Sequence, residues 1–425
     1  MINPVYLLSK LLTCISKTDS ELYRKICIDI KTYKRSKISS FSSDADIACA
    51  QKISEEILKI SDSPSEDVLY IFQHGFFNPT GEKFYSGGAE RYMCDLSRIA
   101  IERNLKVILI QLGDSKRDVP WIKLKKGIHV IGVNGSVDCY ASVIGLLPRP
   151  KFAIYSGFTF FGTRIFDNSL IISHGITWDV PYVNCNIQAI KDILDRHSTI
   201  VSVDTNTLSW LRSTFSYSLI KQPKKFKYIP NYVNLKEFSP APKNESDKLK
   251  ITFPRRLCPE RGFDLFYSAA EEILARYDNV IVEFVGFVHT SDIQKQLDDL
   301  MSRFRDRVTH RLVSADDMPA VYQSTDIVVI PTKFAEGTSL SCLESLASGN
   351  CVISTNIGGL PNLIINDYNG ILINPDREEL VEALKRLIEN HDFRTQLQTR
   401  ACNSAKVFSK DKWEKAWRCL FDEVI

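Results

Sequence analysis

Two carboxylates in the C-terminal half of the chain, Glu336 and Glu344, are separated by seven residues. Carboxylate oxygens accept hydrogen bonds from pairs of sugar hydroxyl groups. The stretch follows an apolar run and leads into a predicted helix start, whose exposed backbone N–H groups suit a phosphate or another anion. Its first loop residues are Gly337, Thr338, Ser339 and Leu340. Taken singly, each glutamate is more typical of a solvated loop or a helix start, so other residues must support a sugar site.

Two arginines, Arg256 and Arg261, flank a proline-containing turn directly after the apolar run 251–254. Two guanidinium groups at one site would neutralise the diphosphate leaving group of an activated sugar. A solvated loop after a strand explains the same spacing equally well. The two arginines therefore support a diphosphate-binding site only in combination with Glu336 and Glu344.

Residues in the N-terminal half could face the same ligand. Gly87 and Gly88 begin a helical segment, and paired glycines allow a backbone to approach a phosphate or sugar closely. They are not a G-x-G-x-x-G fingerprint, so a nicotinamide cofactor is poorly supported. His174 ends an apolar run before Gly175, at the edge where open α/β sheets bind ligands. A plain turn and a structural histidine also explain these features when each is taken alone.

Metal ligands and disulfides are not expected. The seven histidines include no H-x-x-x-H pair, and the eleven cysteines include no C-x-x-C pair. The cysteines stand in apolar segments, which is typical of reduced, buried thiols in a cytoplasmic protein. Asp44 and Asp46 form a D-x-D, but their serine-rich surroundings favour a solvated linker over a metal clamp. We therefore expect no metal and no bound cofactor in the active site.

Charge and hydropathy narrow the class of protein further. The 54 basic and 51 acidic residues give a net charge of +3, which does not indicate a nucleic-acid binder. No apolar run reaches the roughly 18 to 20 residues of a membrane helix. The first residues lack the pattern of a secretory signal. We expect a cytoplasmic protein and make no prediction of its oligomeric state.

The elements that position these residues are apolar runs of strand length alternating with helical patterns. In the first part of the chain the runs cover 68–72, 107–110, 152–155, 170–173 and 200–203, with a helical pattern at 88–103. In the second part they cover 251–254, 280–285, 308–313, 326–330, 352–354 and 371–373, with helical patterns at 262–276 and 378–389. Such alternation is typical of parallel sheets with helices on both faces. We predict two Rossmann-like α/β domains, joined by a polar segment at 239–248, with a cleft at the carboxyl ends of their strands.

Residues 1–65 lie outside this alternation. Apolar residues at helical spacing precede a basic stretch from Arg24 to Lys37. Residues 1–40 hold eight basic and three acidic side chains, a net charge of +5. We favour an amphipathic helical extension packed on the main body. Contact of residues 1–40 with a membrane surface or a partner is the alternative, and it would make the protein membrane-associated.

Together, these segments resemble the retaining family 4 of glycosyltransferases, which have the two-domain GT-B fold. Residues 336–344 match its E-x7-E motif, and Arg256 with Arg261 matches its R-x-x-x-x-K with arginine in place of lysine. Further matches, in the family's order, are 87–91 with G-G-x-E-R, 174–175 with the strand-end H-G, 230–234 with P-N-G-V-D, 358–361 with G-G-x-P and 369–370 with N-G. The resemblance covers residues 68–420.

The resemblance implies a retaining hexosyltransferase acting from a UDP- or GDP-sugar on a hydroxyl of a glycan or lipid-linked acceptor, in polysaccharide or glycoconjugate biosynthesis. The N-terminal domain would bind the acceptor and the C-terminal domain the nucleotide sugar. The implied catalytic residues are His174, Glu336, Arg256 and Arg261. The implied donor-binding residues are Gly87, Gly88, Asn231, Gly286, Gly337, Thr338, Ser339, Leu340 and Glu344, with Glu344 on the ribose. The family reacts without a divalent metal in the active site, and neither glutamate is expected to be a covalent nucleophile.

Departures from the family pattern bear on the site. Tyr232 stands where the family has glycine, so a backbone that needs positive φ there would be strained, or the turn differs. Asn234 replaces an aspartate, and a second glycine is missing after Gly286. Arg261 keeps the charge of the family's lysine but changes its geometry. These changes leave every implied diphosphate contact in the chain.

The resemblance also implies the domain borders. We predict a helical basic extension at 1–65, the acceptor domain at 66–238, the donor domain at 239–406, and a C-terminal helix at 407–425 that crosses back to the acceptor domain. Two alternatives to a transferase stay open. One is a nucleotide-sugar epimerase on the same fold. The other is a non-catalytic scaffold for another glycosyltransferase.

Overall fold

The computed structural model describes residues 44–85, 87–113, 120–133, 140, 143–157, 166–176, 190, 199–215, 226–242 and 248–425. Residues 1–43, which hold most of the predicted basic extension, lie outside the described residues. The described residues fall into two compact units, one within 1–201, 211–227 and 421–425, the other within 202–210 and 228–420. The domain borders predicted from the sequence stay predictions.

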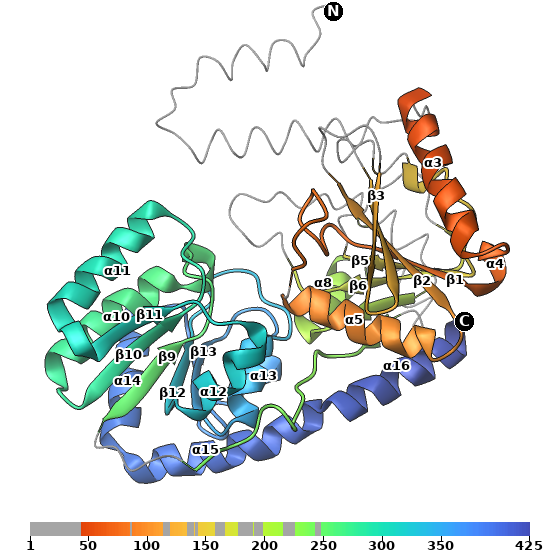
Figure 1. Ribbon diagram of the computed structural model, residues 1–425. Coiled ribbons are helices and arrows are strands. Elements are labelled where there is room, and N and C mark those ends of the chain that lie inside the picture. Colours follow the sequence, from red (N-terminus) through yellow and green to blue (C-terminus); the bar gives the residue numbers. More distant parts are fainter. Residues whose placement is uncertain are drawn as a thin grey trace, which may run out of the picture. The chain divides into compact units, whose positions relative to one another are not determined.

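The first unit is built on an eight-stranded sheet in the order β3-β4-β2-β1-β5-β6-β7-β8 (Figure 1). Its strands are β1 Val68–Phe72, β2 Lys106–Leu112, β3 Trp121–Lys125, β4 Ile128–Val133, β5 Phe152–Ser156, β6 Ser169–Ser173, β7 Thr199–Ser202 and β8 Phe226–Tyr228. β1 pairs in parallel with β2 and β5, and all five of its residues are buried. A central strand covered on both faces accounts for this continuous apolar run. The predicted parallel core of this sheet is confirmed.

The edge of this sheet differs from the prediction of parallel strands alone. β3 pairs antiparallel with β4. The turn between them uses Lys126 and Gly127, whose φ angles are 52° and 78°. Positive φ at both central residues is the geometry of a tight hairpin turn. The sequence W-I-K-L-K lacks a continuous apolar run because its side chains are largely exposed, so apolar pattern alone does not detect this strand.

Among the described residues, the helices α3 Asp44–Ile60, α4 Pro64–Asp67 and α5 Gly88–Ile101 lie in this unit, as does the end of α8 Thr205–Thr214. The prediction of a solvated linker at Asp44 and Asp46 is wrong, since Asp44 begins α3. Ala50, Ile53 and Ile57 are buried along this helix. Their spacing of three and four residues places them on one face, and burial of that face stabilises the helix.

The second unit is built on a six-stranded sheet in the order β11-β10-β9-β12-β13-β14. Its strands are β9 Leu249–Phe253, β10 Val280–Val285, β11 Val308–Arg311, β12 Ile327–Ile330, β13 Cys351–Thr355 and β14 Ile371–Ile373. All neighbouring pairs are parallel, as predicted. β9 lies between β10 and β12, so the strand order reverses there. Open α/β sheets bind ligands at the carboxyl end of such a switch point.

Helices cover both faces of this second sheet (Figure 1). They are α10 Phe263–Arg276, α11 Ser291–Phe304, α12 Met318–Gln323, α13 Leu340–Ala347, α14 Arg377–Glu389 and α15 His391–Ala405, and the helix α16 Lys410–Val424 follows them. In β12, Ile327 and Val329 join the core beneath α10, α11 and α14, whereas Val328 and Ile330 join the core beneath α12 and α13. Burial on both faces explains why β12 is apolar throughout.

The last residues of α16 return to the first unit, which holds Phe421–Ile425. Arg103 donates from Nη2 to Asp422 Oδ1 at 2.7 Å, and its guanidinium lies 5.8 Å from the ring centroid of Phe421. Lys227 pairs with Glu423 at 2.6 Å. Within the described residues, no helix has both the length and the apolar character needed to cross a membrane.

Candidate active site

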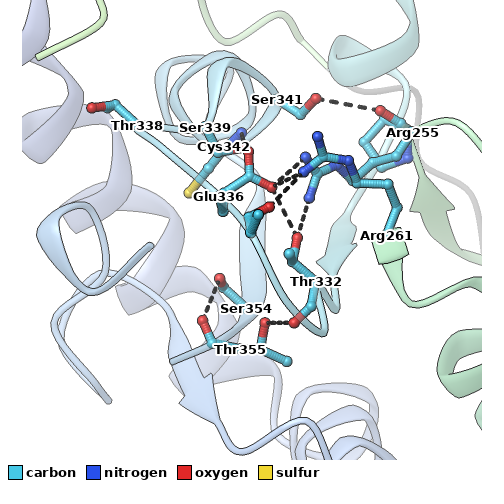
Figure 2. A network of polar contacts seen from close by, with 12 residues as sticks. Arg255, Arg261, Thr332, Glu336, Thr338, Ser339, Ser341, Cys342, Ser354 and Thr355 are labelled. Atoms are coloured by element: carbon cyan, nitrogen blue, oxygen red, sulfur yellow. Dashed lines mark hydrogen bonds and ion pairs between the residues drawn. The ribbon is translucent and has the colours of Figure 1, made fainter. Parts of the chain in front are cut away.

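A buried charge cluster lies at the carboxyl ends of β9 and β12 (Figure 2). Glu336 Oε2 accepts hydrogen bonds from Arg255 Nη2 at 2.5 Å, Arg261 Nη1 at 2.7 Å and Thr332 Oγ1 at 2.9 Å. Arg255 also donates from Nη1 to the Thr332 hydroxyl. Arg255 follows β9, and Thr332 and Glu336 follow β12. The switch point of the sheet therefore brings residues some 80 positions apart in sequence onto one carboxylate oxygen.

The members of this cluster differ in exposure. The side chains of Arg255 and Glu336 are 8% and 9% exposed, whereas that of Arg261 is 24% exposed. Burial opposes ionisation of Glu336, but the charges of Arg255 and Arg261 and their hydrogen bonds together lower the pKa of its carboxyl group below the usual value. Glu336 is therefore a carboxylate at neutral pH, held between two cations.

Two glycines allow the backbone to pass close to this cluster. A Cβ on Gly358 would lie 2.1 Å from the carbonyl oxygen of Glu336, and its φ is +57°. A Cβ on Gly286 would lie 2.2 Å from the carbonyl oxygen of Arg255, and its φ is +150°. Side chains are excluded at both positions by space and by backbone geometry. The predicted site residue Gly286 thus lies against the backbone of Arg255.

The start of α13 is fixed by hydrogen bonds of the loop residues. Ser339 caps the helix, accepting a hydrogen bond from the backbone N–H of Cys342 at 3.4 Å. The Thr338 hydroxyl donates to the carbonyl of Val203, and Asn231 Nδ2 donates to the carbonyl of Thr338 at 2.6 Å. The side chains of Thr338 and Ser339 therefore form hydrogen bonds within the protein. A ligand here would meet the backbone of the loop and the N-terminus of α13.

Glu344 lies in the second turn of α13, as predicted, and is 5% exposed. Its Oε2 accepts a hydrogen bond from the hydroxyl of Tyr322 at 3.2 Å. A buried carboxylate on a helix is unusual unless it is hydrogen-bonded or binds a ligand. Glu344 is thus anchored at one oxygen from α12.

The arginine that pairs with Glu336 beside Arg261 is one that the sequence prediction did not single out. Arg255 rather than Arg256 contacts Glu336, while Arg256 is exposed. Both follow the same strand, and adjacent side chains there point in different directions. The sequence shows two adjacent arginines at this point, but it does not show which of the two side chains points toward Glu336. Contact of Arg256 with a diphosphate stays a prediction.

The predicted residues of the first unit lie at the end of β6 and at the start of α5. His174 follows β6, and its Nε2 is 3.1 Å from Ser156 Oγ. Its ring lies edge-to-face with Tyr92, with centroids 5.3 Å apart. Burial lowers the pKa of His174 to about 4, so the imidazole is neutral at pH 7. His174 can exchange a hydrogen bond with a ligand but carries no charge to it.

The paired glycines begin α5, with Gly87 at the N-cap and Gly88 in the first turn. A Cβ on Gly87 would lie 2.5 Å from Glu90 Oε2. The space beside this glycine is therefore taken by a carboxylate of the same helix. Approach of this backbone to a phosphate stays a prediction.

The substitution of tyrosine at position 232 does not strain the chain. Positive φ angles occur among the described non-glycine residues at Asn104, Lys126, Arg305 and Asp367, so Tyr232 has an ordinary backbone conformation. Its ring packs on Trp413 at a centroid distance of 4.4 Å. Of the two expectations for this position, a strained backbone or a different turn, the structure shows the different turn.

No group of three or more His, Cys, Asp or Glu side chains that could hold a metal ion occurs in the described part of the chain. Of its cysteines, Cys258, Cys342 and Cys351 are buried free thiols.

Comparison with known proteins agrees with this architecture. Residues 236–404 match the family model described as glycosyl transferases group 1. The D-inositol 3-phosphate glycosyltransferase of Paenarthrobacter aurescens is 28% identical over 201 residues, covering 44% of this chain and 48% of that protein. The UDP-Gal:alpha-D-GlcNAc-diphosphoundecaprenol alpha-1,3-galactosyltransferase of Escherichia coli is 30% identical over 188 residues, covering 40% and 47%. The matches span about half the length of the curated relatives.

Solved structures match over more of the chain. Sucrose-phosphate synthase of Thermosynechococcus elongatus has a TM-score of 0.68 at 15% identity, covering 84% of this chain and 99% of that one. HepE of Anabaena in complex with UDP has a TM-score of 0.61 at 14% identity, covering 84% and 100%. These similarities confirm the fold of two Rossmann-like domains called GT-B. The chain thus has the GT-B fold, and its residues 236–404 match the model of the glycosyl transferases group 1 family.

Proposed function

We propose that the protein is a retaining glycosyltransferase that moves a hexose from a nucleoside-diphosphate sugar to a hydroxyl of a glycan or lipid-linked acceptor. The observation that carries the proposal is the contact of Glu336 with Arg261 and Arg255 beside the N-terminus of α13. A carboxylate suits the hydroxyls of the sugar, while cations and free backbone N–H groups suit the diphosphate. Both requirements of an activated sugar are thus met by neighbouring groups.

The proposed reaction takes place on one face of the sugar. The bond from the anomeric carbon to the diphosphate breaks as the bond to the acceptor oxygen forms. The acceptor proton passes to the leaving phosphate oxygen. Arg261, with Arg256, would stabilise the charge that develops on the diphosphate. Glu336 would orient the hexose, Glu344 the ribose, and neutral His174 would hydrogen-bond near the transferred sugar.

The relatives' names support the class of donor and acceptor. One relative is a galactosyltransferase named for UDP-galactose and a diphosphoundecaprenol-linked sugar, and one solved neighbour is a complex with UDP. We therefore propose a UDP- or GDP-sugar donor, with a role in polysaccharide or glycoconjugate biosynthesis in the cytoplasm. Membrane-surface contact through residues 1–40 rests on their net charge of +5.

Thermal-shift screening with UDP, GDP, ADP and their hexose derivatives tests the donor, since a ligand that binds the folded state raises its stability with occupancy. Transfer is then followed by nucleotide release with candidate acceptors. Glu344→Ala and Arg261→Met should each reduce transfer at least about a hundredfold, the size expected for loss of one charge-stabilising contact. Glu382→Ala, an exposed carboxylate on α14, serves as the matched control.

The outcomes separate the alternatives. Nucleotide release that requires acceptor supports a transferase. Interconversion of the donor sugar without acceptor would indicate an epimerase. A chain that binds none of the nucleotides would be a scaffold, and the proposal would be wrong.

A further inference from the structure

The charge cluster around Glu336 contains one more cation than a neutral ion pair needs. Arg255 and Arg261 both donate to the same carboxylate oxygen, so two positive charges and one negative charge leave a net charge of +1. This excess lies beside the loop that leads into α13. A diphosphate binds where a net positive charge is available to it.

The two arginines are not equivalent. Arg255 is held by Glu336 and Thr332, its side chain is 8% exposed, and its carbonyl oxygen packs against Gly286. Arg261 is three times as exposed, at 24%, and its second contact is with the carbonyl of Ala335 at 3.1 Å. Arg255 is therefore fixed inside the cluster, whereas Arg261 borders solvent.

Removing Arg255 would change the net charge that the cluster presents to a ligand at Arg261. Glu336 and Arg261 would then form a closed pair with a net charge of zero. A buried carboxylate left with one cation holds it strongly, because the carboxylate itself has little contact with water. Arg261 would still have N–H groups for a phosphate oxygen, but its charge would be balanced by Glu336 and would attract a diphosphate less.

We propose that Arg255 is a positioning residue that supplies the counter-charge of Glu336, so that Arg261 keeps a net positive charge for the diphosphate of the donor. The inference rests on the proposed function and adds to it a residue outside the arginine pair predicted from the sequence. Arg255 itself touches Glu336 and Thr332 and does not need to touch the substrate.

Calorimetry with UDP, or with GDP where GDP gives the larger thermal shift, tests the charge balance in the full chain. Arg255→Met gives the cluster a net charge of zero and should weaken nucleotide binding about tenfold or more. Glu336→Gln gives +2 and should bind at least as tightly as the wild type. Arg255→Met combined with Glu336→Gln restores +1 and should return affinity to within about threefold of the wild type.

Arg276→Met removes one positive charge from the surface of α10, where the side chain is 55% exposed, and should bind UDP like the wild type. Arg255→Lys keeps the charge and should bind more tightly than Arg255→Met. A purely structural role of Arg255 predicts a different result, because the double variant would then be as weak as Arg255→Met or weaker.

Unchanged affinity of Arg255→Met, or a double variant without recovery, would overturn the inference while leaving the proposed function in place. If Arg255→Met does not fold, the comparison of Glu336→Gln with the double variant decides, since the double variant must bind more weakly. A wild-type protein that binds no nucleotide would overturn the proposed function, and this inference with it.

Discussion

The side-chain amide of Asn231 donates a 2.6 Å hydrogen bond to the backbone carbonyl of Thr338, 107 residues further along the chain. This bond ties the segment before β9 to the loop that carries Glu336. The same loop is held by the hydroxyl of Thr338 on Val203. The loop before α13 is thus fixed by groups from outside its own strand and helix.

Asn231→Ala should lower the free energy of unfolding by about 1–2 kcal/mol, because the partly buried carbonyl of Thr338 loses its donor. It should also weaken UDP binding, since the loop is less well held. Denaturant unfolding and calorimetry measure the two effects. Asn234→Ala removes two exposed local hydrogen bonds, one to Glu237 and one from the backbone N–H of Lys236, and is the matched control, with an expected change below about 0.5 kcal/mol. Equal effects of both variants would contradict the role of Asn231.

Gly358→Ala should displace the backbone of Glu336. The new methyl group would lie 2.1 Å from the carbonyl oxygen of Glu336, at a φ of +57° that alanine rarely adopts. We expect a loss of about 1–3 kcal/mol in stability and a larger fractional loss of transfer activity. Thermal unfolding and initial rates measure both.

Gly75→Ala provides the control for this substitution. Its new methyl group would be in ordinary contact with the ring of Tyr85 at 3.5 Å. A Gly358→Ala variant that unfolds like Gly75→Ala would show that the backbone around Glu336 can shift without cost.

His174 should make the protein less stable in mild acid. Its pKa is about 4 in the folded state, below the ordinary value of 6.5, so the unfolded state binds the proton more readily between these values. Stability should therefore rise with pH across this window, and this residue should contribute on the order of 2–3 kcal/mol. Unfolding of the wild type and of His174→Asn between about pH 4 and 7 measures the contribution.

His174→Asn should flatten the pH dependence, whereas substitution of the exposed His391 by Asn should leave it unchanged. Identical pH profiles for the wild type and His174→Asn would mean that the imidazole titrates normally in the folded protein.

Ionisation of Glu336 should also make the stability rise with pH, but at lower pH than the titration of His174. Burial opposes its ionisation, but Arg255 and Arg261 lower the pKa of its carboxyl group below the ordinary 4.5, with Cys342 and Tyr322 as the other titratable groups nearby. The stabilisation is complete above pH 4.5 and is lost as pH falls through the folded-state pKa. The difference in melting temperature between wild type and Glu336→Gln should therefore shrink below about pH 4. A constant difference would exclude titration of this group.

The buried strands were predictable, whereas the edge strand β3 was not. β12 and β1 are apolar throughout because both faces are covered, and this pattern is visible in the sequence. β3 alternates and is largely exposed, so its pairing depends on the turn at Lys126 and Gly127. The start of α3 was taken for a linker because serines precede Asp44, although Ile53 and Ile57 have the helical spacing expected of the extension.

The site was predictable in its residue types more than in its contacts. Glu336 and Arg261, which the family pattern places in one site, are in contact, and their roles toward a ligand stay predictions. Arg255 rather than Arg256 contacts Glu336, and the backbone of Arg255 lies against Gly286. That packing joins segments 31 residues apart in the numbering, so local sequence does not contain it.

The hairpin at the edge of the first sheet also bears on how copies of the protein behave when concentrated. An exposed edge strand offers unpaired backbone groups that a second molecule could extend. β3 forms this edge, and although Leu124 is 66% exposed, lysines stand on both sides of it at 123 and 125, with a third at 126 in the turn. If the β3 edge of a second copy approached this one, the lysines of the two copies would repel each other. The short strand β3, which its apolar pattern does not reveal, thus opposes the pairing of this sheet with the sheet of a second molecule.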